Sequence, residues 1–233
     1  MKNPPLQQGH DGPRAPPLRP YQADTLQRMK SYEGNAALCV IATGLGKTRI
    51  FAEYIRCDVL ENDHHILILS HREELVIQPL EYLKGLPCGI EQGTTHAHGE
   101  PIISASVQSL VGRLDKYNPY SIDTIIIDEA HHAITDGYRR ILDYFSGAKV
   151  LGVTATPDRG DMRNLGEVFD SLAFEYKLTD AIKEGYLCKI MAQTIPLQLD
   201  ITSVTMSGGD YAVGDLGTAL DPYLEQIAAE MAR

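Results

Sequence analysis

Residues 36–48 read AALCVIATGLGKT, and this stretch decides the fold. Its apolar run, Ala36–Ile41, predicts a strand that is buried on both faces, because near-continuous apolar runs are typical of central parallel strands. The glycines that follow let backbone N–H groups turn inward as an anion-binding nest. A helix that starts near Lys47 adds the positive end of its dipole. A strand, a glycine turn and Lys47-Thr48 at a helix start therefore predict a phosphate loop.

The predicted phosphate loop has a role for each of its polar groups. Lys47 would contact the β- and γ-phosphates of a nucleotide, and the Thr48 hydroxyl would hold Mg²⁺. One position departs from the common GxxxxGKT pattern, because the first glycine of that pattern falls at Ile41. An ordinary strand-to-helix turn with chance glycines is the alternative interpretation. The expected nucleotide contacts are Thr43, Gly44, Leu45, Gly46, Lys47 and Thr48.

A later apolar run ends in two carboxylates. Residues 125–132 read IIIDEAHH. Ligands of α/β sheets lie at the carboxyl ends of the strands, so we expect both acids to point toward the bound phosphates. Asp128 fits the role of holding Mg²⁺, and Glu129 fits that of the base that orients or deprotonates the attacking water. A strand that simply ends in solvated acids is the alternative.

No motif in the sequence indicates a zinc site or a disulfide framework. The histidine pairs His64-His65 and His131-His132 are adjacent in sequence, and neighbours on an extended segment point to opposite sides. Neither pair is therefore expected to share a metal ion. The cysteines lie far apart without a CxxC pair, and we expect them to be reduced thiols. They are Cys39, Cys57, Cys88 and Cys188.

Strand-length apolar runs alternate with amphipathic stretches along most of the chain. Predicted strands are 36–41, 66–70, 102–105, 122–128 and 150–154, and predicted helices between them are 47–60, 72–84, 107–114 and 138–145. This alternation predicts an α/β fold with a mainly parallel central sheet and helices on both faces. The proline-rich residues 1–17 are expected to be a flexible leader, 18–190 the folded domain, and 191–233 a connector, in which we expect a turn at 207–210 and a helix at 221–233.

The overall composition is that of a globular protein. Hydrophobic residues make up 43% and charged residues 22% of the 233 positions. The sequence lacks an apolar run of roughly 20 residues and a secretory signal pattern, so the expected location is cytoplasmic, or nuclear in a eukaryote. The net charge of −10 argues against a basic protein that coats nucleic acid, but it allows a local basic track.

Taken together, the motifs resemble those of superfamily-two helicases and translocases. The resemblance runs from about Leu18 to Gly185 and is nearest to the DEAH-type branch, which includes the type III restriction-enzyme motor subunit and XPB-like DNA translocases. Residues 44–48 match motif I, residues 128–131 (DEAH) match motif II, and residues 154–157 (TATP) match motif III. The resemblance implies a RecA-like P-loop NTPase domain in which the Thr154 and Thr156 hydroxyls bond with motif II, His131 especially.

Shorter matches extend the resemblance to the base and to nucleic acid. Residues 19–22 (RPYQ) resemble an adenine-reading motif, which implies base contacts for Arg19 and Gln22, whose amide can donate and accept at once. Residues 70–75 and 106–110 occupy the places of motifs Ia and Ib, which line the nucleic-acid track in the family. These matches imply contacts from Arg72 and Gln108, and Arg159, which follows motif III, is a third candidate.

The function that the resemblance implies is an ATP-dependent helicase or translocase, of which this chain would be the first motor domain. Its cofactors would be ATP and Mg²⁺, and its partners nucleic acid, with duplex DNA favoured, and a second RecA-like domain of the same polypeptide. That domain would supply an arginine to the ATP site, so we expect weak hydrolysis by this chain alone. The alternatives are a P-loop ATPase with another target and a nucleic-acid-binding module without unwinding activity.

Overall fold

The computed structural model describes residues 16–155 and 165–192, and in the C-terminal segment 206–207, 210–211, 217, 219–224 and 228. The chain divides into two compact units, Met1–Cys188 and Lys189–Arg233, each of which is described by itself. The leader and the connector expected from the sequence stay predictions. Residues 1–15 and most of 193–233 lie outside the described part of the chain.

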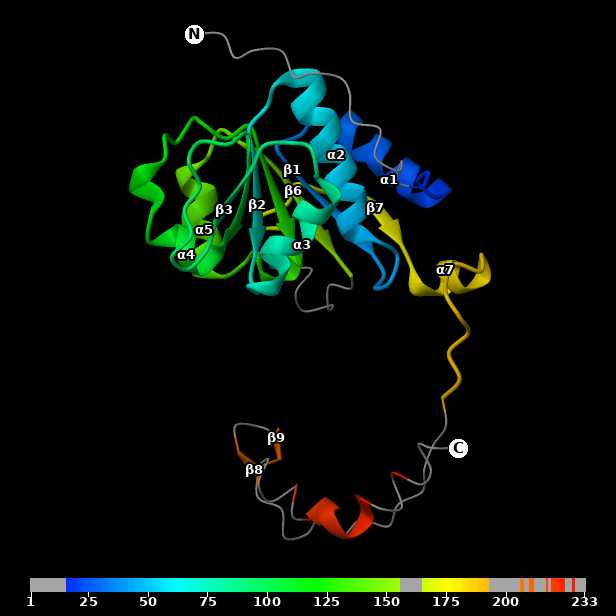
Figure 1. The fold of residues 1–233 in the computed structure, drawn as a ribbon. Helices are drawn as coiled ribbons and strands as arrows, with labels where there is room; N and C mark the ends of the chain where they lie inside the picture. The colour runs from blue at the N-terminus through cyan, green and yellow to red at the C-terminus, as the bar shows by residue number, and fades with distance from the viewer. Residues whose placement is uncertain are drawn as a thin grey trace. The chain divides into compact units, whose positions relative to one another are not determined.

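A twisted parallel sheet forms the centre of the first unit (Figure 1). It has seven strands in the order β3-β4-β2-β5-β6-β1-β7, and every pairing between them is parallel. All of their carboxyl ends therefore lie along one edge, which is where ligands bind in such sheets. The strands are β1 (Ala36–Ile41), β2 (Ile66–Ser70), β3 (Cys88–Glu91), β4 (Ile102–Ser106), β5 (Thr124–Asp128), β6 (Lys149–Thr154) and β7 (Ser171–Tyr176).

Helices cover both faces of this sheet (Figure 1). One face carries α1 (Pro20–Ser31), α2 (Lys47–Asn62) and α3 (Glu74–Tyr82), and the other carries α4 (Val107–Val111) and α5 (Asp136–Tyr144). Two short 3₁₀ turns, η1 (Leu114–Lys116) and η2 (Ala130–His132), follow α4 and β5, and α7 (Leu178–Lys183) follows β7. The predicted fold class is confirmed, and the sheet is parallel throughout.

Strand β1 shows why a continuous apolar run is needed at the centre. Its alternate residues Ala37, Cys39 and Ile41 pack into the core under α1 and α2, whereas Leu38 and Val40 pack into the core on the opposite face. Successive strand residues point to opposite faces, so a strand covered on both sides must be apolar at every position. Burial raises the pKa of the Cys39 thiol to about 12, as expected for an unreactive core residue.

Two strands of the seven-stranded sheet, β3 and β7, were not predicted, and both lie at its edges. Strand β3 has only four residues and contains Gly89, and β7 exposes Ser171 and Leu172. Neither sequence carries the dense run of Ile, Leu and Val that marks the central strands. Helix α3 covers Glu74–Tyr82 and is thus shorter than the predicted 72–84, and Arg72 lies in the bend before it.

The second unit is described only in part. Strands β8 (Met206–Ser207) and β9 (Asp210–Tyr211) pair antiparallel, with Ser207 opposite Asp210, in agreement with the turn predicted at 207–210. The 3₁₀ turn η3 covers Asp221–Tyr223, and most of the helix predicted over 221–233 lies outside the described residues. None of the described helices is long and apolar enough to cross a membrane.

Gly152 provides a test of packing beneath the site. A Cβ built at Gly152, in the middle of β6, would lie 2.4 Å from the Phe169 ring and 2.8 Å from Ala130 Cβ. We expect Gly152→Ala to lower the free energy of unfolding by roughly 1 to 3 kcal/mol, because an overpacked core must shift. Gly147→Ala is the matched control, since nothing lies within 4 Å of a Cβ there. Equal denaturant midpoints for the two variants would show that this packing is loose.

Candidate functional site

The phosphate loop follows β1 at the carboxyl edge of the sheet. Gly44 and Gly46 have φ angles of 83° and 76°, a left-handed conformation that glycine adopts without strain. Helix α2 starts directly after the loop at Lys47, so the free N–H groups of its first turn face the space above the strand end. The strand, loop and helix predicted from residues 36–48 are all present.

The acidic strand end lies beside this loop. Strand β6 separates β1 from β5, and the Lys47 ammonium comes within 3.9 Å of a Glu129 carboxylate oxygen, Oε1. Both side chains are largely covered, at 12% and 31% exposure. Two motifs separated by about eighty residues in sequence thus meet in a single site, and the amine faces the carboxylate across it.

The two carboxylates of motif II have different environments. Asp128 is 4% exposed, and one of its oxygens, Oδ1, accepts a hydrogen bond from the Glu129 N–H at 3.0 Å. Burial, and next the charge of Glu129, raise the pKa of Asp128 to about 6. Glu129 has a φ of 52°, which is unfavourable for a side chain without local compensation. The site therefore concentrates negative charge, and Glu129 is held there in a strained backbone conformation.

His131 connects motif II to the end of β6. Its Nδ1 lies 3.1 Å from the Thr154 hydroxyl and 3.5 Å from the Glu129 carboxylate. The contact expected between His131 and Thr154 is therefore present. Thr156, which was also expected to bond with motif II, and Arg159, a candidate nucleic-acid contact, lie outside the described residues.

The prediction that His131 and His132 point to opposite sides is wrong. Strand β5 ends at Asp128, and both histidines belong to the 3₁₀ turn η2, which brings their ring centroids to 4.1 Å. The premise failed because the segment is not extended. Among the described residues, no group of three or more His, Cys, Asp or Glu side chains is arranged to hold a metal ion.

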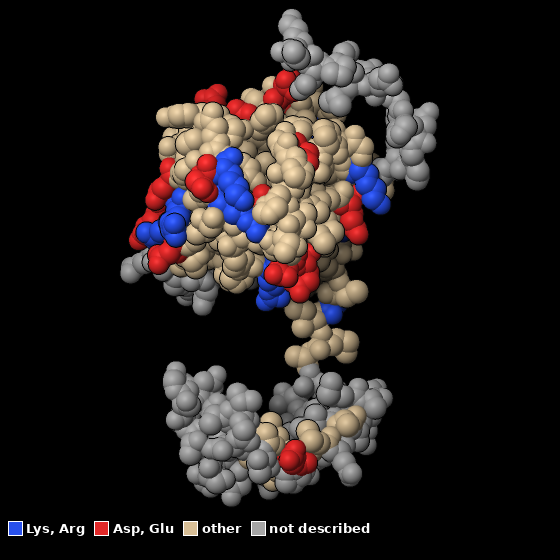
Figure 2. All heavy atoms as spheres, turned by 60° about the vertical axis from the view of Figure 1, so that its left-hand side comes forward, with Lys and Arg blue, Asp and Glu red and all other residues tan. Residues whose placement is uncertain are grey.

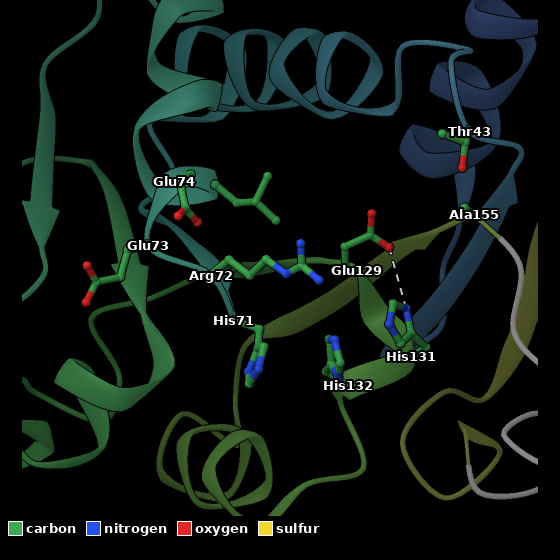
Figure 3. A pocket seen from close by; sticks show the side chains of 10 residues that line it. Thr43, His71, Arg72, Glu73, Glu74, Glu129, His131, His132 and Ala155 are labelled. Carbon is green, nitrogen blue, oxygen red and sulfur yellow. Dashed lines mark ion pairs between the residues drawn. The ribbon is translucent and has the colours of Figure 1, made fainter. Parts of the chain in front are cut away.

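A pocket of about 960 Å³ joins these residues to the segment after β2 (Figure 3). In Figure 3 the Arg72 side chain extends across this pocket toward Glu129. His71 stacks on His132 with ring centroids 4.5 Å apart. Burial, followed by the charges of His131 and His71, lowers the pKa of His132. The sequence did not predict that Arg72 and Glu129 share a pocket, because no spacing rule links the two strand ends.

Gln108, in the first turn of α4, contacts the same segment. Its side-chain amide donates to the His71 carbonyl oxygen at 3.0 Å, which places Gln108 beside the segment that carries Arg72. That the two side chains face one groove stays a prediction. Figure 2, which brings the left-hand side of Figure 1 forward, shows Lys and Arg side chains interspersed with Asp and Glu on that face. No continuous basic track is visible in that view.

The other end of the phosphate loop is tied to α1. The Gln22 amide donates to the Leu45 carbonyl oxygen at 3.0 Å, and its own oxygen accepts from the Arg19 N–H at 2.9 Å. The Tyr21 hydroxyl donates to the same Leu45 oxygen at 2.9 Å, a role that sequence reasoning did not assign. Gln22 is 7% exposed, and these two hydrogen bonds use one of the two N–H donors of its amide and one of the two lone pairs of its oxygen.

Comparison with known families and proteins agrees with this geometry. Residues 15–159 match the family described as type III restriction enzyme, res subunit. An inferred ATP-dependent helicase of Saccharomyces cerevisiae, IRC3, is 33% identical over 228 residues, which cover 89% of this chain and 33% of that protein. An inferred mitochondrial ATP-dependent helicase of Schizosaccharomyces pombe, irc3, is 35% identical over 79% of this chain and 33% of that protein. This chain thus spans about a third of the length of these relatives.

Solved helicase structures share the fold. The helicase domain of Pyrococcus furiosus Hef superposes with a TM-score of 0.56 at 24% identity, covering 68% of this chain and 37% of that one. The UvsW helicase of bacteriophage T4 gives a TM-score of 0.58 at 15% identity, covering 71% and 62%. At these identities the likeness concerns the RecA-like architecture alone.

The raised pKa of Asp128 predicts a pH-dependent stability. Unfolded Asp ionises near pH 4, whereas the buried side chain holds its proton up to about pH 6, so the folded chain loses stability as the pH rises through this window. We expect Asp128→Asn, in Mg²⁺-free buffer, to raise the free energy of unfolding above pH 6 by on the order of 3 kcal/mol at most. Below pH 4 the gain should vanish.

Denaturant unfolding of both chains from pH 4 to pH 8 measures this effect. Asp24→Asn, on the exposed side of α1, is the matched control and should leave the stability unchanged. A loss of stability in Asp128→Asn above pH 6 would contradict the unfavourable burial of this charge.

Proposed function

The chain belongs to the family described as type III restriction enzyme, res subunit, and from this premise we propose that it is the first motor domain of an ATP-dependent helicase or translocase. The observation that supports the proposal most strongly is the approach of Lys47 to Glu129, which places the phosphate-loop amine beside the candidate base. Fold, family and site geometry all favour nucleotide hydrolysis.

We expect the phosphates of ATP to bind in the phosphate loop, from Thr43 to Thr48, and its base to lie beside Arg19 and Gln22. Residues Thr43, Gly44, Leu45 and Gly46 would offer backbone N–H groups to the phosphates, and Lys47 would contact the outer ones. Arg19 and Gln22 would hold the base, with Gln22 braced against Leu45. The left-handed glycines support this arrangement, since a side chain at either position would be strained.

The residues present also fit Mg²⁺. Oxygen ligands suit this ion, and the Thr48 hydroxyl and the Asp128 carboxylate are the oxygens that would hold it. Burial, and next the charge of Glu129, raise the pKa of Asp128, so a cation beside this carboxylate pair would stabilise its charged form. When bound, the ion would neutralise charge on the transferring phosphoryl group. His131 and Thr154, with Thr156, would connect this end of the site to the strand that follows it.

Glu129 is the proposed base for the attacking water. Its carboxylate is 31% exposed and faces the pocket, so water can reach it. The Lys47 ammonium lies 3.9 Å from its Oε1, and His131 Nδ1 lies 3.5 Å from its Oε2. These two contacts restrict the orientation of the carboxylate. Proton acceptance at Glu129 and charge stabilisation by Lys47 are the two contributions that this chain would make to hydrolysis.

Nucleic acid is the proposed partner, with duplex DNA favoured by the restriction-enzyme family. Arg72 and Gln108 are the candidate contacts, together with Arg159. A second RecA-like domain would supply an arginine across the cleft, and such an arginine accelerates phosphoryl transfer by roughly a thousandfold or more. Hydrolysis by this chain alone should therefore be slow. A cytoplasmic location stays a prediction, and the name of the S. pombe relative places that protein in mitochondria.

Removal of the Lys47 amine tests nucleotide binding. We expect Lys47→Ala to weaken Mg²⁺-ADP by roughly a hundredfold in calorimetry, because truncating one member of a covered charge contact costs about 2 to 5 kcal/mol. Lys30→Ala, which removes an exposed pair with Glu61, is the matched control and should bind normally. Equal affinities for the two variants would refute the phosphate-loop assignment.

Glu129→Gln separates binding from hydrolysis. The amide keeps the shape of the side chain but is not a base, so Mg²⁺-ATP should still bind while turnover falls by on the order of a hundredfold or more. The assay is single-turnover ATP hydrolysis, first with this chain and then with a longer chain that includes the second domain. Glu167→Gln, at an exposed pair with Arg139, controls for a surface change. Unchanged turnover in Glu129→Gln would favour a binding module or a different base.

A further inference from the structure

An aromatic cluster lies beside the proposed base-reading residues. Tyr21 is 5% exposed and fills the centre of this cluster. One face of its ring stacks on Tyr176 with centroids 4.6 Å apart, and Tyr186 meets it edge-on at 5.0 Å. Tyr21 is therefore packed into the core and has no free face for a ligand. None of residues 1–20, which precede it, is Phe, Tyr or Trp.

Tyr186 is the member of the cluster that meets Arg19. The guanidinium carbon of Arg19 lies 5.4 Å from the centroid of the Tyr186 ring, within the range of a cation–π contact. Arg19 Nη1 also approaches the Tyr21 hydroxyl at 3.4 Å. Arg19 is exposed and Tyr186 is half-buried, so the ring supports one face of the guanidinium while the arginine stays accessible.

The backbone at the end of α7 sets the place of Tyr186. Gly185 has a φ of 77°, which turns the chain back over the helix end. The N–H groups of Tyr186 and Leu187 both donate to the carbonyl oxygen of buried Ala181, at 2.9 and 3.1 Å. Leu187 in turn reaches the phosphate loop, because a Cβ built at Gly44 would lie 3.4 Å from its Cδ2. One short segment thus touches both Arg19 and the loop.

We propose that Tyr186 is a positioning residue for the nucleobase: its ring holds the Arg19 guanidinium flat, so that the opposite face of the guanidinium stacks on the adenine whose edge Gln22 pairs with. This inference rests on the proposed nucleotide site. An exposed arginine loses much rotamer freedom when it stacks on a ligand, and a ring that already holds it lowers that cost. Tyr186 acts through Arg19, and the phosphate contacts do not depend on it.

The test compares a ligand that has a base with one that lacks it. Mg²⁺-ADP and Mg²⁺-pyrophosphate are titrated by calorimetry into the wild-type chain and its variants. Tyr186→Leu keeps apolar packing against Tyr21 but removes the π face, so ADP affinity should fall roughly tenfold while pyrophosphate affinity stays unchanged. Tyr186→Phe keeps the ring and should bind ADP normally. Tyr120→Leu, at a tyrosine that is 85% exposed, is the matched control.

A double-mutant cycle shows whether Tyr186 acts through Arg19. Arg19→Ala should lower ADP affinity, and adding Tyr186→Leu to it should cost little more, because the two residues form one unit. Additive losses, or an equal loss of pyrophosphate affinity in Tyr186→Leu, would overturn the proposal. So would unchanged ADP affinity in that variant. Thermal unfolding is recorded for each chain, and Tyr186→Met replaces Tyr186→Leu should the latter not fold.

Lys47→Ala in the same titrations separates the two hypotheses. It should lose both ADP and pyrophosphate. If Lys47→Ala binds both as the wild type does, the proposed nucleotide site itself is wrong. If Lys47→Ala loses both while Tyr186→Leu loses neither, the nucleotide site stands and the role of Tyr186 is refuted.

Discussion

The structure depends on one geometric constraint, which is that parallel strands all end at the same edge of their sheet. Strand β1 delivers the phosphate loop to this edge, and β5 delivers Asp128 and Glu129 two places away. The 3.9 Å distance between the Lys47 ammonium and the Glu129 carboxylate follows from this placement, although the two residues are far apart in sequence. The apolar faces of β1 and β5, covered by helices on both sides, are what keep the two strand ends in register.

The site concentrates negative charge at the end of β5. Asp128 is buried next to another carboxylate, and its raised pKa expresses the cost of holding both charges there. Glu129 also has an unfavourable backbone conformation. Lys47 offsets part of this repulsion. A cation would lie beside the carboxylates of Asp128 and Glu129, and a polyphosphate would lie in the loop beside Lys47. The buried negative charge that lowers the stability of the folded chain would therefore favour binding of a metal–nucleotide complex.

Features that depend on local sequence could be predicted, and features that depend on packing between distant segments could not. The bounds of β1 and β2 match their apolar runs, because a strand buried on both faces has only one compatible composition. Strand β7 was not predicted, because half of its residues are exposed at the edge of the sheet and its sequence therefore lacks a continuous apolar run. The apolar run 125–127 correctly predicted that Asp128 and Glu129 follow a strand, yet the turn of η2, which stacks His132 on His71, has no signal in the sequence. Tyr186 likewise lies more than 160 residues from Arg19, and only the folded chain brings the two together.

The central claim is that the phosphate loop and the acidic strand end form one site for a metal–nucleotide complex. The most direct measurement is a crystal structure of this chain with ADP and Mn²⁺, with anomalous scattering recorded to locate the ion. The account predicts a single strong anomalous peak between the Thr48 hydroxyl and the Asp128 carboxylate, with the β-phosphate in the loop above Lys47. Nucleotide bound away from the loop, or an ion held by other residues, would contradict it.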